Sequence, residues 1–207
     1  MATATIIMPT FNHEGTIQYA INSVLAQTLT DFELFIMGDG VPEESKSLIK
    51  SLVASDDRIR FFDFPKHERR GEPHRHEALQ EASGRIVCYM CDRDLWLPDH
   101  LERMELLLQQ ADFAHSLSVH ILPQGEYLFF PVDLGLPIQR RMMLERDNRV
   151  PFSCAAHTMK IYRALPEGWA TTPSGMATDW HMFRKFLALE SCRTVSGTYP
   201  SAITFPS

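Results

Sequence analysis

The sequence has no long apolar run, and this absence argues against a membrane-spanning protein at the outset. A helix that crosses a bilayer needs about 18 or more consecutive apolar residues, and no such run occurs in the chain. The first residues also lack the basic start and the apolar stretch of a secretion signal. We therefore expect a cytoplasmic protein without stable membrane insertion.

Cysteine is also scarce, with four residues in 207, which is too few for a disulfide scaffold in a chain of this size. We expect all four to be reduced. Cys88 and Cys91 form a Cys-x-x-Cys pair, but residues three apart on a strand point to opposite faces, so we expect no zinc or redox site.

Positively charged residues are not in excess either. The formal net charge of -6 argues against nucleic acid as a partner.

The chain does have enough apolar residues, 44% of the total, for one sizeable core. Short apolar runs predict buried strands, and apolar residues at helical spacing follow most of them. The predicted strands lie at 5–8, 32–37, 58–64 and 86–90, and the predicted helices at 17–25, 42–53, 76–82 and from 98 onward. This alternation predicts one α/β domain over residues 1–207, built on a doubly wound, mostly parallel sheet.

The second half of the chain is less regular. Residues 113–122 and 127–132 are separated by Pro123-Gln124-Gly125 and predict a small antiparallel pair. Residues 139–150 carry several arginines without a clear period, so we expect either a loop or a short helix. A helix is predicted to begin at Thr178, with Asp179 in its first turn.

Polar residues follow the predicted strands directly. Asp92, Arg93 and Asp94 come after the strand at 86–90, Asp39 lies between two glycines after the strand at 32–37, and the turn at 9–12 follows the first strand. In open α/β sheets ligands bind at the carboxyl ends of the strands, so these residues predict a site at that edge. The alternative is that the same aspartates serve only as turn and helix-capping residues.

Several short motifs occur in order along the chain. In the first half they are Ile7-Met8-Pro9-Thr10-Phe11-Asn12, Ser23-Val24-Leu25-Ala26-Gln27-Thr28, Phe32-Glu33-Leu34-Phe35-Ile36-Met37, Gly38-Asp39-Gly40 and Asp92-Arg93-Asp94-Leu95-Trp96-Leu97-Pro98. In the second half they are Ala156-His157-Thr158 and Thr178-Asp179-Trp180. Together these motifs resemble one known family, the family 2 glycosyltransferases, closely in the first half and more loosely in the second.

The resemblance implies a GT-A fold and inverting transfer of a sugar from a nucleotide diphosphate sugar to a hydroxyl acceptor. Residues 1–110 would form the donor half and 111–207 the acceptor-side half. It also implies that Asp179 is the catalytic base and that a divalent metal, Mn²⁺ or Mg²⁺, is held by Asp92 and Asp94. The expected donor-binding residues are Pro9, Thr10, Phe11, Asn12, Asp39, Arg70, Arg75, Asp92 and Arg93.

Arg93 departs from the family pattern, in which the position between the two carboxylates is often acidic. An arginine lowers the local negative potential that a hard cation requires. Either Arg93 pairs with one carboxylate while the metal binds the other, or Arg93 replaces the metal against the diphosphate in a metal-independent reaction. A third alternative is a catalytically inactive sugar-nucleotide binding module. A nucleotidyltransferase is less favoured, because the turn at 10–15 has only one glycine.

Overall fold

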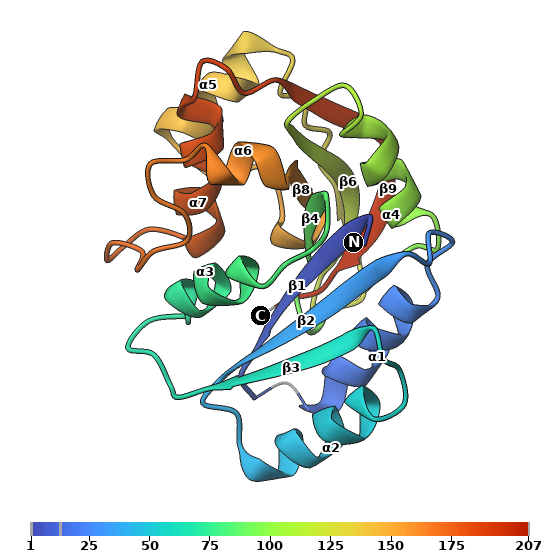
Figure 1. Cartoon of the computed structure of the whole chain (residues 1–207). Coiled ribbons are helices and arrows are strands. Elements are labelled where there is room, and N and C mark those ends of the chain that lie inside the picture. Colours follow the sequence, from blue (N-terminus) through green and yellow to red (C-terminus); the bar gives the residue numbers. More distant parts are fainter. Residues whose placement is uncertain (1, 13, 207) are drawn as a thin grey trace.

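One mixed sheet runs through both halves of the chain in the computed structural model, which describes residues 2–12 and 14–206 (Figure 1). Its strands follow the order β3-β2-β1-β4-β8-β6-β9-β5, and β7 pairs with β6. The strands are β1 (Ala4–Thr10), β2 (Phe32–Asp39), β3 (Ile59–Phe64), β4 (Ile86–Tyr89), β5 (Leu95–Trp96), β6 (Phe113–Ile121), β7 (Tyr127–Phe129), β8 (Ala155–Thr158) and β9 (Thr194–Thr204). The α-helices are α1 (Glu14–Leu25), α2 (Glu43–Val53), α3 (Glu72–Gln80), α4 (His100–Leu107), α5 (Pro137–Glu145), α6 (Met159–Arg163) and α7 (Thr178–Ala188).

The first half is the predicted parallel sheet. β1 pairs in parallel with β2 and β4, and β2 pairs in parallel with β3. Ile6, Ile7 and Met8 are all fully buried, which is typical of a strand covered on both faces. In Figure 1, α1 and α2 lie on one side of β1, β2 and β3, and α3 lies on the other. The sequence pattern therefore predicted the α/β class and the parallel sheet correctly.

Helix α3 begins earlier than the sequence predicted. It starts at Glu72 rather than at residue 76, with Gly71 before it in the left-handed conformation (φ 64°) and Pro73 at its first positions. Its first turns carry histidines and arginine rather than apolar residues, so no helical period is visible there. Arg75 consequently lies on a rigid helix rather than in a loop, and its position is fixed by the packing of α3.

The second half contains the predicted antiparallel pair and one long strand that was not predicted. β6 pairs antiparallel with β7 and β8, and the expected loop or short helix is the helix α5. β9 runs parallel to β6 and antiparallel to β5, with register shifts along β6 near His115 and Leu117. Its sequence contains Gly197 and Pro200, which weaken a strand prediction.

Two further sequence predictions concern cysteine and membranes. All four cysteines are free thiols, as expected from their number. Across residues 2–12 and 14–206, no helix combines the length and the apolar character needed to cross a bilayer.

The junction between α3 and β4 depends on a glycine, and this gives a first prediction. A Cβ on Gly84 would lie 2.4 Å from the backbone nitrogen of Thr5 and 2.6 Å from the carbonyl carbon of Ala4. Because both are backbone atoms of the central strand, Gly84→Ala should reduce the free energy of unfolding by about 1–3 kcal/mol. Urea denaturation measures this loss. Gly15→Ala is the matched control, because a Cβ there meets nothing within 4 Å; equal losses in both variants would contradict the prediction.

Candidate active site

A cleft of about 530 Å³ opens at the carboxyl ends of β1, β2 and β4. It brings together residues that are far apart in the sequence, including Asp39, Asp92 and Asp179. Of the residues expected from the sequence, the cleft is lined by Pro9, Thr10, Phe11, Asn12, Asp39, Arg70, Arg75, Asp92, Arg93 and Asp179. Asp94 is not part of the lining. The lining residues that the sequence did not assign to the site are Lys66, Arg69, Cys91, Phe152 and Thr178.

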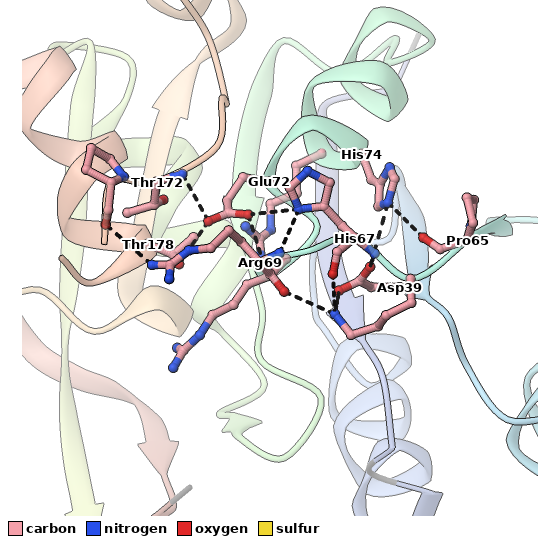
Figure 2. A network of polar contacts seen from close by, with 12 residues as sticks. Asp39, Pro65, His67, Arg69, Glu72, His74, Thr172 and Thr178 are labelled. Carbon is pink, nitrogen blue, oxygen red and sulfur yellow. Dashed lines mark hydrogen bonds and ion pairs between the residues drawn. The ribbon is translucent and has the colours of Figure 1, made fainter. Parts of the chain in front are cut away.

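Asp39 anchors the basic loop between β3 and α3. Its Oδ2 accepts a hydrogen bond from Lys66 Nζ at 2.6 Å, and its Oδ1 accepts one from the His67 backbone N–H at 2.6 Å. Lys66 Nζ also donates to the carbonyl oxygens of His67 and Arg69 at 2.9 and 3.0 Å. Figure 2 shows these contacts converging beside Asp39. The loop is therefore held against the end of β2, with Lys66 also 5.2 Å from the Phe11 ring centroid.

Glu72 is a second anchor, which the sequence analysis did not identify. Its side chain is fully buried and accepts hydrogen bonds from Arg70 N, Thr172 N and Thr178 Oγ1 at 3.0, 3.3 and 3.4 Å. Figure 2 shows Glu72 between the basic loop and the segment that carries Thr172 and Thr178. Burial alone would raise its pKa, but hydrogen bonds from its own backbone, Thr172 and Arg70 outweigh burial and lower it.

Arg75 supplies a buried positive charge to the cleft. Its guanidinium lies 4.8 Å from the ring centroid of Trp169, and its Nη2 donates to the Arg70 carbonyl at 3.0 Å. Its Nε and Nη1 are buried and have no hydrogen-bond partner within residues 2–12 and 14–206. Burial lowers its pKa, opposed by the charge of Glu72, but an arginine stays protonated in proteins. Two nitrogens of a charged guanidinium that lines the cleft thus have N–H groups without an internal partner among the described residues.

The side chains of Asp92, Arg93 and Asp94 have two different roles: some line the cleft, and others hold neighbouring segments in place. Asp94 Oδ2 accepts a hydrogen bond from Ser153 Oγ at 2.5 Å, and Oδ1 accepts one from the Phe205 N–H at 3.0 Å. Burial raises the pKa of Asp94. Arg93 Nε donates to the Phe205 carbonyl at 3.5 Å and also lines the cleft. Asp92 is therefore the carboxylate of this segment that borders the cleft, while Asp94 holds the end of β9.

These residues do not form a complete metal site by themselves. In the part of the chain that the structure describes, no group of three or more His, Cys, Asp or Glu side chains is placed to hold a metal ion. Magnesium sites in phosphate-transferring enzymes use one or two carboxylates together with substrate phosphates. Asp92 alone satisfies that minimum, so a metal would depend on the bound phosphates for its other ligands.

Asp179 lies in the first turn of α7 and lines the cleft. Its Oδ2 accepts a hydrogen bond from Asn148 Nδ2 at 2.7 Å, and its Oδ1 accepts one from the Trp180 N–H at 2.9 Å. Burial raises its pKa, and this effect exceeds the opposing hydrogen bonds and the charges of Arg75 and Arg70. A carboxylate with a raised pKa accepts a proton more readily, so the position suits a general base.

Comparison with known proteins identifies the family. The family model named Glycosyl transferase family 2 matches residues 5–167, which is most of the chain. This chain belongs to glycosyltransferase family 2. That conclusion agrees with the resemblance carried by its sequence motifs.

Two curated relatives match the family 2 chain over about half of its length. A GalNAc(5)-diNAcBac-PP-undecaprenol beta-1,3-glucosyltransferase from Campylobacter jejuni is 30% identical over 117 residues, 56% of this chain and 37% of that protein. The Escherichia coli UDP-Glc:alpha-D-GlcNAc-diphosphoundecaprenol beta-1,3-glucosyltransferase WfgD is 35% identical over 98 residues, 47% of this chain and 38% of that protein. The matched regions thus span less than half of either relative.

Solved structures share the fold over nearly the whole family 2 chain. S. aureus TarS 1-349 in complex with UDP-GlcNAc has a TM-score of 0.77 at 14% identity, covering 99% of this chain and 59% of that chain. The mannosyltransferase PcManGT from Pyrobaculum calidifontis, in complex with GDP-Man and Mn²⁺, has a TM-score of 0.67 at 17% identity, covering 99% and 56%. The GT-A fold that the sequence predicted is confirmed.

The buried Glu72 carboxylate gives a prediction about stability and pH. Glu72→Gln should reduce the free energy of unfolding at neutral pH by about 1–3 kcal/mol, because a charged acceptor of several hydrogen bonds is lost. The pKa of Glu72 in the folded chain lies below its ordinary value of 4.5, so its contribution is present above that pH and disappears as the pH falls through the folded pKa. Urea denaturation from pH 7 to pH 3 should therefore show the two proteins converging in acid.

Glu77→Gln is the control for this experiment, because Glu77 lies on the same helix with an exposed side chain. Its stability should follow that of the unmodified chain at every pH. A constant difference between Glu72→Gln and the unmodified chain from pH 7 to pH 3 would show that the carboxylate charge does not matter.

Proposed function

We propose that this chain transfers a sugar from a nucleotide diphosphate sugar to a hydroxyl acceptor, with inversion at the anomeric carbon and Asp179 as the base. The observation that carries this proposal is the cleft itself. It combines a partly buried carboxylate of raised pKa, Asp179, with a buried guanidinium, Arg75, that has two nitrogens without a hydrogen-bond partner among the described residues. A proton acceptor and a cation for the leaving group are the two requirements of this transfer.

In this proposal the first half, residues 1–110, binds the donor. The turn at 9–12 and Asp39 contact the nucleoside, and the guanidinium groups of Arg70, Arg75 and Arg93 face the diphosphate. Arginine suits this role because its planar donors match phosphate oxygens. A uridine nucleotide is the preferred donor, since WfgD is named for UDP-Glc and TarS was solved with UDP-GlcNAc.

The reaction is a single displacement. The acceptor oxygen forms a bond to the anomeric carbon on the face opposite the diphosphate, while the bond from that carbon to the diphosphate oxygen breaks. Asp179 takes the proton that leaves the acceptor hydroxyl. The nucleoside diphosphate departs with the bonding electron pair, and the guanidinium groups stabilise its added negative charge.

A divalent metal fits this cleft only as a partner of the donor. Asp92 would hold Mn²⁺ or Mg²⁺ together with the diphosphate oxygens, because Asp92 lines the cleft and Asp94 does not. When bound, the metal would supply additional charge stabilisation to the leaving diphosphate. Arg93 offers positive charge at the same place without a metal, so metal dependence is decided by experiment.

The acceptor in this proposal is a saccharide carried on a lipid diphosphate. Both curated relatives are named for acceptors of that kind, linked to undecaprenol through a diphosphate. Residues 111–207 would present the accepting hydroxyl, because this half carries Asp179.

A second candidate function follows from Arg93. Its guanidinium stands beside Asp92, where the family pattern is acidic, and this favours a binding module that keeps the nucleotide sugar without turnover. The two functions differ in whether Asp179 acts as a base and the bound donor is turned over. Variants of Asp179 and Asn148 separate them.

Thermal unfolding with UDP tests the donor cleft and the metal together. A ligand at about 100 times its dissociation constant adds roughly 2.7 kcal/mol, which raises the unfolding midpoint by several degrees in a chain of this size. We expect UDP to stabilise the chain, and Arg75→Met to weaken UDP binding by about 10- to 100-fold through loss of charge-assisted hydrogen bonds. Stabilisation only with Mn²⁺ supports Asp92 as a metal ligand, whereas stabilisation in chelator that Arg93→Met removes supports Arg93 as its substitute.

Arg141→Met is the matched control for Arg75→Met, because the Arg141 side chain is 72% exposed and forms an ion pair with Glu145 on its own helix, away from the cleft lining. It should leave UDP binding unchanged. If UDP, GDP and ADP all fail to shift the unfolding midpoint with or without metal, the proposal that this cleft binds the donor is contradicted.

The role of Asp179 is tested by two variants in a transfer assay with UDP-glucose. Asp179→Asn should reduce transfer by about 10²- to 10⁴-fold and leave UDP binding nearly intact. Asn148→Leu removes a hydrogen bond that favours the ionised carboxylate, so the pKa of Asp179 should rise further. Because the base must be ionised to act, the acid limb of the pH–rate profile should move to higher pH.

A structural role for Asp179 would give a different result. Asp179→Asn would then lower the unfolding midpoint without a selective loss of transfer, and Asn148→Leu would leave the acid limb in place. Donor binding by the unmodified chain with no transfer to any saccharide acceptor would favour the binding module.

A further inference from the structure

A second cavity, of about 440 Å³, shares a wall with the proposed donor cleft. The wall is the segment 148–152. Phe152 lines the donor cleft, whereas Asn148 and Pro151 line the second cavity. Asn148 also donates its hydrogen bond to Asp179 at 2.7 Å, so the second cavity begins one side chain away from the proposed base.

The floor of this cavity is polar and partly unsatisfied. Ser116 and Ser118 come from β6 and are 2% and 3% exposed. Ser116 Oγ and Arg149 Nε are buried without a hydrogen-bond partner in the part of the chain that the structure describes. The Cys154 thiol lies beside Ser116, but a thiol is only a weak donor. A buried hydroxyl and a buried guanidinium N–H therefore remain for a ligand rich in oxygen.

The cavity carries little net charge. Burial lowers the pKa values of His115 and His120, so both imidazoles are neutral at pH 7. Arg149 Nη2 pairs with Asp147 Oδ2 at 3.3 Å, and these two charges offset each other. Such a lining favours neither a phosphate, which needs an excess of cations, nor a metal ion, which needs an excess of carboxylates.

An aromatic ring completes the lining. Phe130 follows β7 directly, is 59% exposed and lies with its ring centroid 5.9 Å from that of His120. Binding pockets for small molecules combine such apolar faces with a few well-placed polar groups. A sugar ring offers both surfaces, with hydroxyl groups around its edge and C–H groups on its face.

We infer that this second cavity binds a neutral saccharide, as the part of the acceptor that lies beyond the hydroxyl receiving the transferred sugar. The role in acceptor binding rests on the proposed function. The binding itself does not, because it can be measured without turnover. Asn148 then contacts both sites, and it would align the accepting hydroxyl with Asp179.

Saturation-transfer NMR tests the inference with the methyl glycosides of glucose, N-acetylglucosamine and N-acetylgalactosamine, each measured with and without saturating UDP and Mg²⁺. At least one glycoside should bind in both conditions. Its affinity should fall about tenfold in Phe130→Ala, the loss expected when one aromatic contact is removed. Phe129→Ala is the matched control, because Phe129 is 45% exposed on the same hairpin but does not line the cavity.

Ser116→Val provides a second variant inside the cavity, with its unfolding midpoint measured first to show that it folds. It should weaken the glycoside and leave UDP affinity unchanged. The inference is overturned if no glycoside binds at millimolar concentration, if UDP displaces the glycoside, or if Phe129→Ala and Phe130→Ala weaken it equally. Failure of UDP to bind would instead contradict the proposed donor site. In that case, the glycoside measurements made without UDP would still test whether the second cavity binds a saccharide.

Discussion

The arrangement of the cleft depends on two carboxylates that hold a basic loop at the edge of the sheet. Asp39 ends β2 and Glu72 begins α3. The loop between β3 and α3 donates a side-chain and a backbone hydrogen bond to Asp39 and a backbone hydrogen bond to Glu72. Lysine and arginine side chains gathered in one loop repel one another in the absence of anions. The two carboxylates offset that repulsion, and so they allow positive charge to accumulate where a diphosphate is proposed to bind.

The same constraint explains how Arg75 tolerates burial. Removing a guanidinium from water is costly, and no carboxylate lies within hydrogen-bond distance of it among the contacts found in the described chain. The Trp169 ring, the Arg70 carbonyl and the charge of Glu72 lower that cost without using all of its N–H groups. An anion in the cleft would satisfy the remaining groups. If the donor binds as proposed, part of its binding energy would thus be prepared by the fold before it arrives.

The sequence predicted the parallel half well and the anchors poorly, for identifiable reasons. Apolar runs such as the one containing Ile6, Ile7 and Met8 reflect burial on both faces, which a single sequence records directly. Glu72 looked like an ordinary charged residue, because its partners Thr172 and Thr178 are about 100 positions away. The beginning of α3 and the whole of β9 were missed for a related reason: tertiary contacts, rather than local periodicity, stabilise them.

Asp179 shows how the two halves of the cleft are coupled through charge. Burial raises its pKa, while the positive charges of Arg75 and Arg70 act in the opposite direction. A diphosphate bound by these arginines would neutralise part of their charge and thereby weaken the effect that lowers the pKa. Asp179 would then become a stronger base when the donor is in place. In the proposed reaction, the ability of Asp179 to accept the proton would thus be linked to the presence of the leaving group, without any side-chain movement.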